Sequence, residues 1–177
     1  NLVVHKGKTI FVGDTSVHEY PTSEQMAEIA ISAARVVRLF GFDPKVAFVS
    51  HSTFGQPLTS RTKHIKNAVE ILKSKNVNFE FDGDMQPDVA LNEEYKTLYP
   101  FSKIVGNANI LIMPGQHSAA ISYKMMKTLG DTKVIGPLLI GLGLPIEIAP
   151  LRSSTSEIIN LASIAAYSAD VIDYKKS

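Results

Sequence analysis

Short runs of apolar residues alternate along this chain with longer stretches in which apolar positions recur every three or four residues. The short runs have the length of β-strands, and the longer stretches have the period of amphipathic α-helices. Strands that alternate with helices are typical of a mostly parallel sheet, because each helix carries the chain back across the sheet. The pattern therefore predicts one three-layer α/β/α module over residues 1–177, with no internal repeat or linker.

The boundaries of the predicted elements follow from local signals. Thr22 and Gln25 form the pattern of a capping box at the start of a helix, and Gly41 ends that helix. The predicted helices cover residues 23–40, 61–74, 88–99, 116–129 and about 155–171. The predicted strands are Thr9–Gly13, Val46–Val49, Phe79–Asp82, Ile110–Met113, Val134–Ile135 and Pro145–Ile148.

Composition narrows the classes of partner. Hydrophobic residues make up 45% and charged residues 20% of the chain, the balance of a soluble globular protein. A net charge of +1 gives no reason to expect nucleic acid or a membrane as partner, and no apolar run approaches the ~18–20 residues that cross a bilayer. The lack of cysteine excludes disulfides and is compatible with a cytoplasmic location. The chain opens on Asn1 rather than methionine, so we expect a piece of a longer protein.

Ligands of open α/β sheets bind beyond the carboxyl ends of the strands, and three loops meet that condition. The first follows the buried run that ends at Val49 and precedes a predicted helix. Its hydroxyls and backbone N–H groups suit an anion, although a polar turn with a hydroxyl cap would explain the same residues. The candidate ligand-binding residues in this loop are Ser50, Ser52, Thr53 and Gly55.

The second loop, Pro114–Ala120, also leaves a buried strand and enters a helix. Its candidate ligand-binding residues are Gln116, His117 and Ser118, and a plain helix cap is the alternative reading. The third loop, Gly136–Gly143, allows either close approach of a ligand or a tight connection. The histidines are scattered with no carboxylate at ligand spacing, so we predict no metal site.

Most of the chain resembles the phosphotransacetylase family. Residues 21–30 read PTSEQMAEIA, which is similar to the PTAEQLAEIA of that family. Residues 40–47 read FGFDPKVA beside the family's FGIEPRVA, and Gly136-Pro137 matches a further family motif. The resemblance implies the phosphate acetyl/butyryltransferase fold, which is isocitrate-dehydrogenase-like. It also implies that this chain lacks the upstream half of the family's domain.

The chain departs from the family where catalysis would occur. The resemblance places the family's catalytic serine and arginine on Pro150 and Leu151, and its aspartate on Glu157. The family loop PDLNTGN is replaced by PGQHSAA at residues 114–120. Losing preorganised donors costs several kcal/mol of barrier, so we expect no catalytic residues here. Arg152 remains a candidate ligand-binding residue and could replace the missing arginine if the loop shifted.

Similar departures occur in the C-terminal domains of hybrid bacterial malic enzymes, which share the ISY of residues 121–123. The resemblance implies a non-catalytic domain that binds acetyl-CoA as an effector and supports a homo-oligomer, a dimer or larger. NAD(P) and a divalent metal are then expected only in an upstream malic enzyme domain, which converts malate to pyruvate. A working phosphate acetyltransferase that uses Arg152 and Ser153 stays open as an alternative, as does a purely structural dimerisation domain.

Overall fold

The computed structural model describes residues 1–174 and contains one six-stranded sheet with the strand order β4-β3-β5-β2-β1-β6. The strands are β1 (Leu2–His5), β2 (Lys8–Gly13), β3 (Lys45–Val49), β4 (Glu80–Met85), β5 (Ile110–Ile112) and β6 (Thr132–Ile135). The helices are α1 (Ser23–Leu39), α2 (Ser60–Ser74), α3 (Pro87–Leu91), α4 (Glu93–Lys96), α5 (Gln116–Leu129) and α6 (Thr155–Tyr174). Strands β4, β3, β5 and β2 are parallel, whereas β1 is antiparallel to both of its neighbours.

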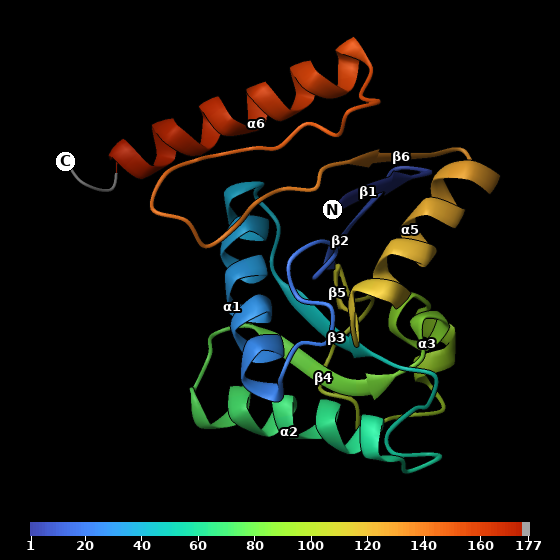
Figure 1. Cartoon of the computed structure of the whole chain (residues 1–177). Helices are drawn as coiled ribbons and strands as arrows, with labels where there is room; N and C mark the ends of the chain where they lie inside the picture. The colour runs from blue at the N-terminus through green and yellow to red at the C-terminus, as the bar shows by residue number, and fades with distance from the viewer. Residues whose placement is uncertain (175–177) are drawn as a thin grey trace.

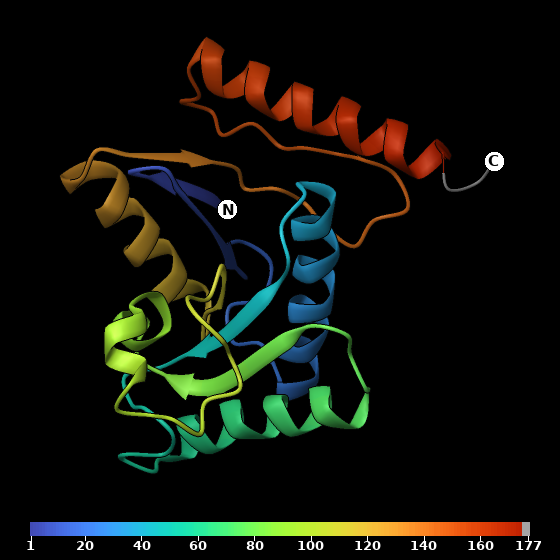
Figure 2. The ribbon, with the colours of Figure 1, turned by 180° about the vertical axis from the view of Figure 1, so that it is seen from behind.

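Helices cover both faces of this sheet, which confirms the predicted three-layer architecture. Helices α1 and α2 lie on one face, and α3 and α5 lie on the other (Figures 1 and 2). The central strands are apolar over Val46–Val49 and Ile110–Ile112, because successive residues there enter different cores. Phe48 packs on the α1 and α2 side, whereas Ala47 and Val49 pack on the opposite side.

The predicted capping box holds the start of α1 in place. The Thr22 side chain accepts a hydrogen bond from the backbone N–H of Gln25, and the Gln25 side chain accepts one from the N–H of Thr22. Gly41 has a φ of 81°, the left-handed conformation that ends a helix at little cost for glycine. Local signals in the sequence therefore placed this element correctly.

Strand β1 was not predicted, since residues 2–5 read only as the lead-in to the next strand. Lys6 and Gly7 both have positive φ angles, 46° and 77°, as in the two-residue turns that favour β-hairpins. This turn pairs β1 with β2, and β1 then pairs with β6 on its other side. An apolar run followed by Lys-Gly was the missed signal.

Two further boundaries were wrong. Strand β4 continues through Gly83 and Asp84 to Met85, because its parallel pairing with β3 continues across a shift in register. The helix predicted over residues 88–99 is two short helices, α3 and α4, separated at Asn92. Asn92 is extended and its side chain accepts from the N–H of Glu94, so it caps the second helix and interrupts the first.

The strand predicted at Pro145–Ile148 is not formed either. Large apolar residues occur there at every second position, as in a strand, but Leu144, Ile146 and Ile148 are all exposed. A single antiparallel bridge joins Glu147 to Leu138, and the segment has no ladder partner in the described part of the chain. A strand needs a neighbour to satisfy its backbone groups, and the pattern alone does not supply one.

Helix α6 lies outside the three layers, beyond the edge of the sheet that β6 forms (Figures 1 and 2). Leu161 is its one buried apolar side chain up to residue 170, while Ile158 and Ile159 are exposed. The hydroxyl of Tyr167 donates to the carbonyl of Leu39, and Glu157 pairs with Lys127, so two polar contacts attach it to α1 and α5. No helix among residues 1–174 is long and apolar enough to cross a membrane.

Candidate functional site

The loop after β3 is tied to the end of β4 by its own polar groups. The hydroxyl of Ser52 donates to the carboxylate of Asp84, and the backbone N–H of Gly55 donates to the same carboxylate at 3.0 Å. The hydroxyl of Thr53 accepts from the backbone N–H of Gln86 at 3.2 Å. Ser52, Thr53 and Asp84 are buried. Three of the four candidate residues in this loop therefore stabilise the fold directly.

Ser50, the fourth candidate residue of this loop, is half-buried. Its hydroxyl lies 3.4 Å from Nδ1 of His51 and 3.5 Å from the hydroxyl of Ser52. The helix that follows does not start at this loop, because α2 begins at Ser60 and is capped by Thr59. The start of α2 thus agrees with the helix predicted over residues 61–74, and the N–H of Thr62 in its first turn donates to the hydroxyl of Thr59.

The loop after β5 does enter a helix directly, as predicted. Gln116, His117 and Ser118 form the first turn of α5. The N–H of Gln116 donates to the carbonyl of Glu19 at 3.1 Å, and the hydroxyl of Ser118 donates to the carbonyl of Gly115. The backbone N–H groups of His117 and Ser118 have no acceptor among residues 1–174, so they remain free to bind a ligand.

Side chains of the segment before α1 lie beside this helix start. Nε2 of His117 is 3.6 Å from a carboxylate oxygen of Glu19, and its ring stacks on Tyr20 with centroids 6.4 Å apart. Gly115 permits this approach, since a Cβ there would lie 2.7 Å from the carbonyl oxygen of Glu19. Glu19 and Tyr20 therefore pack against the start of α5.

Pro150 and Leu151, the positions that resemble the family's catalytic pair, lie in a turn before α6. Pro150 and Leu151 are exposed, and Leu151 has lost none of its accessible surface to packing. Pro150 accepts through its carbonyl from the N–H of Ser153 in a turn. Arg152 is exposed and makes no ion pair with the described residues.

Glu157 is engaged in holding α6. Its carboxylate lies 2.7 Å from Nζ of Lys127 and accepts from the backbone N–H and the hydroxyl of Ser154. The hydrogen bond from Lys127, followed by those from Ser154, lowers the pKa of Glu157 to about 2. A carboxylate with so low a pKa is a poor proton acceptor near neutral pH. Lys127 lies eleven residues beyond Gln116 on α5, about 16 Å along the helix. Glu157 therefore contacts the far end of α5 and not its first turn.

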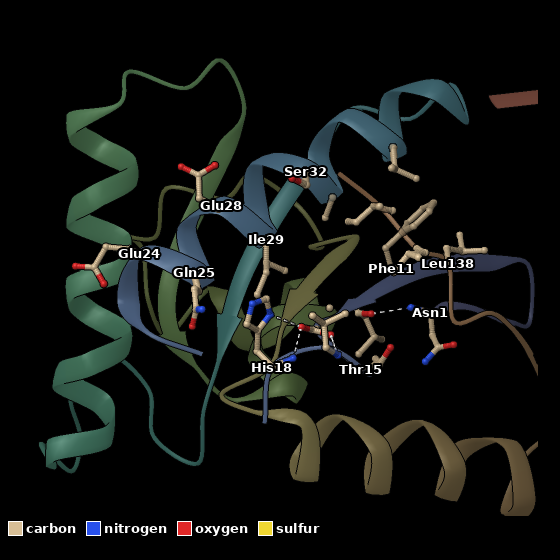
Figure 3. A pocket seen from close by; sticks show the side chains of 18 residues that line it. Asn1, Phe11, Thr15, His18, Glu24, Gln25, Glu28, Ile29, Ser32 and Leu138 are labelled. Carbon is tan, nitrogen blue, oxygen red and sulfur yellow. Dashed lines mark hydrogen bonds and ion pairs between the residues drawn. The ribbon is translucent and has the colours of Figure 1, made fainter. Parts of the chain in front are cut away.

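A cavity of about 380 Å³ opens beside the carboxyl end of β2 (Figure 3). It lies between β2, α1 and the segment Leu138–Ile140, and none of the predicted ligand-binding residues lines it. A smaller cavity of about 240 Å³ lies between α2 and β4 and reaches Gly55. The third predicted loop, Gly136–Gly143, supplies one wall of this larger cavity through Leu138–Ile140, whereas the sequence did not indicate the walls from β2 and α1.

Asp14 organises the rim of this larger cavity. Its carboxylate accepts backbone N–H bonds from Ser16, Val17 and His18 at 2.8–3.0 Å, and it lies 2.7 Å from Nδ1 of His18. Burial alone would raise the pKa of Asp14, but these four hydrogen bonds outweigh it and lower the pKa. An aspartate directly after a strand, with histidine four residues later, was the available sequence signal.

The lowered pKa of Asp14 predicts an acid-sensitive contribution to stability. Its folded-state pKa lies below the ordinary value of 3.8, so the contribution is present above that value and is lost as the pH falls through the folded pKa. We expect Asp14→Asn to be less stable than the parent at pH 7, with a smaller difference near pH 2. Urea unfolding at both pH values measures this, and an equal difference at the two would contradict it.

Comparisons with known proteins identify the family. The model of the family described as phosphate acetyl/butaryl transferase matches residues 1–166. The chain belongs to this family. Its fold agrees with a phosphotransacetylase from Streptococcus pyogenes, with a TM-score of 0.89 and 32% identity over 95% of this chain and 52% of that one. The expected phosphate acetyl/butyryltransferase fold is thereby confirmed.

Relatives in sequence are of two kinds. An NADP-dependent malic enzyme of Rhizobium meliloti is 46% identical over 96% of this chain and 22% of its own length. A phosphate acetyltransferase of Clostridium acetobutylicum is 35% identical over 90% of this chain and 49% of its own length. The chain thus spans about a fifth to a half of these relatives. The comparisons confirm the predicted resemblance to one part of malic enzymes, a part that is related to the phosphate acetyl/butaryl transferases.

Among residues 1–174, no group of three or more histidine and carboxylate side chains could hold a metal ion. The carboxylates of Asp82 and Asp84, two residues of β4, both already accept hydrogen bonds from the protein. Asp82 accepts from the N–H groups of Gly83 and Lys103, and Asp84 accepts from the loop described above. Their carboxylates serve the connection between strands.

Proposed function

We propose that this chain is a non-catalytic regulatory domain that binds acetyl-CoA and supports oligomerisation in a cytoplasmic NAD(P)-dependent malic enzyme. The oxidative decarboxylation of malate to pyruvate, with its NAD(P) and divalent metal, belongs in this proposal to a domain upstream of Asn1. The observation that carries the proposal is the state of the three positions that resemble the family's catalytic residues. Pro150 and Leu151 have no group to polarise a phosphate, and Glu157 is bound to Lys127.

Binding is supported by the groups that remain. The first turn of α5 offers free N–H groups at His117 and Ser118, where the helix dipole favours an anion such as a coenzyme A phosphate. Ser50 is half-buried and Arg152 is exposed, so both are polar residues that a ligand could reach. A surface that holds the ligand without turning it over suits an effector domain.

Oligomerisation is supported by the exposed apolar side chains of the last two helices. Ile121, Met125 and Leu129 are exposed on α5, and Ile158 and Ile159 are exposed on α6. Apolar surface gathered in this way is typical of faces that meet another protein surface. In the proposal, that surface is supplied by the malic enzyme domain of the same polypeptide or by a second copy.

Calorimetry and malate oxidation with the full-length protein test the proposal. We expect heat on addition of acetyl-CoA, a change in the rate of malate oxidation, and no acetyl phosphate formed from acetyl-CoA and phosphate. Formation of acetyl phosphate that falls in Arg152→Ala would establish the acetyltransferase alternative. The absence of both binding and any effect on malate oxidation would contradict the proposal and leave a structural role.

A further inference from the structure

The smaller cavity lies at the edge of the sheet, where α2 packs beside the outermost strand β4 (Figure 1). Its volume of about 240 Å³ is just below the range of drug-sized sites, roughly 300–1,000 Å³, so it suits a small ligand. None of the described residues that line it also lines the larger cavity beside β2. Gly55 is the one predicted ligand-binding residue among them. A ligand held here would therefore bind separately from acetyl-CoA.

Aromatic rings form much of the apolar wall of this cavity. Phe54 and Phe101 meet edge to face with centroids 4.8 Å apart, and Tyr99 supports both rings at 5.6 and 6.2 Å. Leu58 and Phe101 line the cavity although they are 69% and 64% exposed, so both still offer apolar surface to a ligand. Aromatic rings favour such edge-to-face contacts beyond the apolar area that they bury. A further ring from a ligand can extend this arrangement.

Three lysine side chains line the same cavity, Lys66 and Lys73 from α2 and Lys103 from the segment between α4 and β5. Lys73 is paired with Glu70, whereas Lys66 and Lys103 form no ion pair among residues 1–174. The hydrogen bond from Lys73 lowers the pKa of Glu70, and the charges of Lys73, Lys103 and Lys66 lower it further, so the three cations gather around one carboxylate. One carboxylate among three cations leaves a net positive charge for the anionic group of a ligand.

The inner side of the cavity is negative instead. Asp82 and Asp84 line it there, and both are buried with carboxylates that already accept hydrogen bonds from the protein. They would repel an anion placed deep in the cavity, so the favourable position for an anion is beside the exposed lysines. The edge of an aromatic ring carries a partial positive charge, so a ring directed inward is compatible with these carboxylates.

We propose that this cavity binds a small aryl phosphate or aryl carboxylate, with its ring beside Phe54 and Phe101 and its anionic group at Lys66 and Lys103. In this arrangement Glu70 competes with the ligand, because its carboxylate is paired with the third lysine, Lys73. The inference goes beyond the proposed function, since it assigns a second ligand to a separate cavity.

Phenyl phosphate and benzoate are the probes, because each joins one ring to one anionic group. Their binding to the full-length protein is measured by calorimetry, together with that of inorganic phosphate. We expect a dissociation constant of about 1 mM for phenyl phosphate, as is usual for a ligand of this size. Inorganic phosphate should bind at least about tenfold more weakly, because it lacks the ring.

Charge variants are expected to act in opposite directions. Lys66→Gln and Lys103→Gln should each weaken the binding of phenyl phosphate about three- to tenfold, because each removes a charge-assisted contact. Glu70→Gln should strengthen it about two- to fivefold, because Lys73 is then free to bind the ligand. A general loss of stability would not produce the gain. Phe101→Ala should weaken phenyl phosphate and leave inorganic phosphate unchanged.

Lys63→Gln is the matched control. Lys63 is an exposed cation on the same helix but does not line the cavity, so its replacement changes the net charge equally and should leave the affinity for phenyl phosphate unchanged. Thermal unfolding verifies the fold of each variant. If one lysine variant does not fold, the other lysine variant and Glu70→Gln decide.

The outcomes are distinct from those that test the proposed function. Binding of acetyl-CoA should be unchanged in all of these variants, whether or not the aryl site exists. If neither phenyl phosphate nor benzoate binds, or if inorganic phosphate binds as tightly as phenyl phosphate, the inference is overturned. It is overturned as well if Lys63→Gln weakens binding as much as Lys66→Gln and Lys103→Gln do. None of these results alters the case for acetyl-CoA.

Discussion

Asp84→Ala is expected to lower the free energy of unfolding by roughly 2–5 kcal/mol. The carboxylate is buried, with 3% of its residue surface exposed, and it accepts from the hydroxyl of Ser52 and the N–H of Gly55. Each buried donor left without an acceptor costs about 1–3 kcal/mol. Urea unfolding followed by circular dichroism measures the change.

Asp88→Ala is the matched control for this variant. Asp88 is an exposed carboxylate four residues later, and its hydrogen bond is to the N–H of the next residue, Val89. We expect its replacement to cost less than about 1 kcal/mol. Equal effects of the two variants would mean that Asp84 does not anchor the loop after β3. Ser52 and Gly55 would then again be candidates for ligand binding.

The second large effect is expected at Phe48 in the centre of β3. Phe48 is fully buried in the core beneath α1 and α2, and Gly83 of the adjacent strand lies against its backbone. Phe48→Ala should destabilise the protein by about 3–5 kcal/mol, because it removes a large buried ring and leaves a cavity.

Phe101→Ala gives the comparison for Phe48. This ring is 64% exposed and touches the rings of Phe54 and Tyr99 at the surface. Its loss should cost no more than about 1 kcal/mol. A loss as large as that of Phe48→Ala would contradict the assignment of the core, and both values come from the same denaturant titration.

The candidate site combines groups that the sequence could and could not indicate. The start of α5 was predicted because a buried strand followed by Pro-Gly and a helical period marks a loop at the ligand-binding edge. The loop after β3 looked equally suitable in sequence, yet Ser52 and Gly55 already donate hydrogen bonds to the carboxylate of Asp84. Asp84 lies 32 residues beyond Ser52 and 29 beyond Gly55, and a sequence pattern does not show which polar groups a distant residue will satisfy.

The cavity was only partly indicated for a related reason. One wall, Leu138–Ile140, lies in the third predicted loop, but it faces β2 and α1, which are about a hundred residues earlier in the chain. Asp14 and His18 are close in sequence, but an aspartate four residues before a histidine is common and gains meaning only beside an open apolar space. The hairpin of β1 and β2 was within reach of sequence reasoning through the Lys6-Gly7 turn.

The sequence by itself determined the α/β class, the start of α1 and the central strands β3 and β5. These depend on local periodicity, capping and residue identity, which neighbouring positions encode. The tertiary structure alone decided that residues 145–148 lack a partner strand, that Asp84 occupies the loop after β3, and that Asp14 and His18 line a cavity. Such properties depend on which distant segments pack together, because strand pairing, burial and hydrogen-bond satisfaction are shared between them.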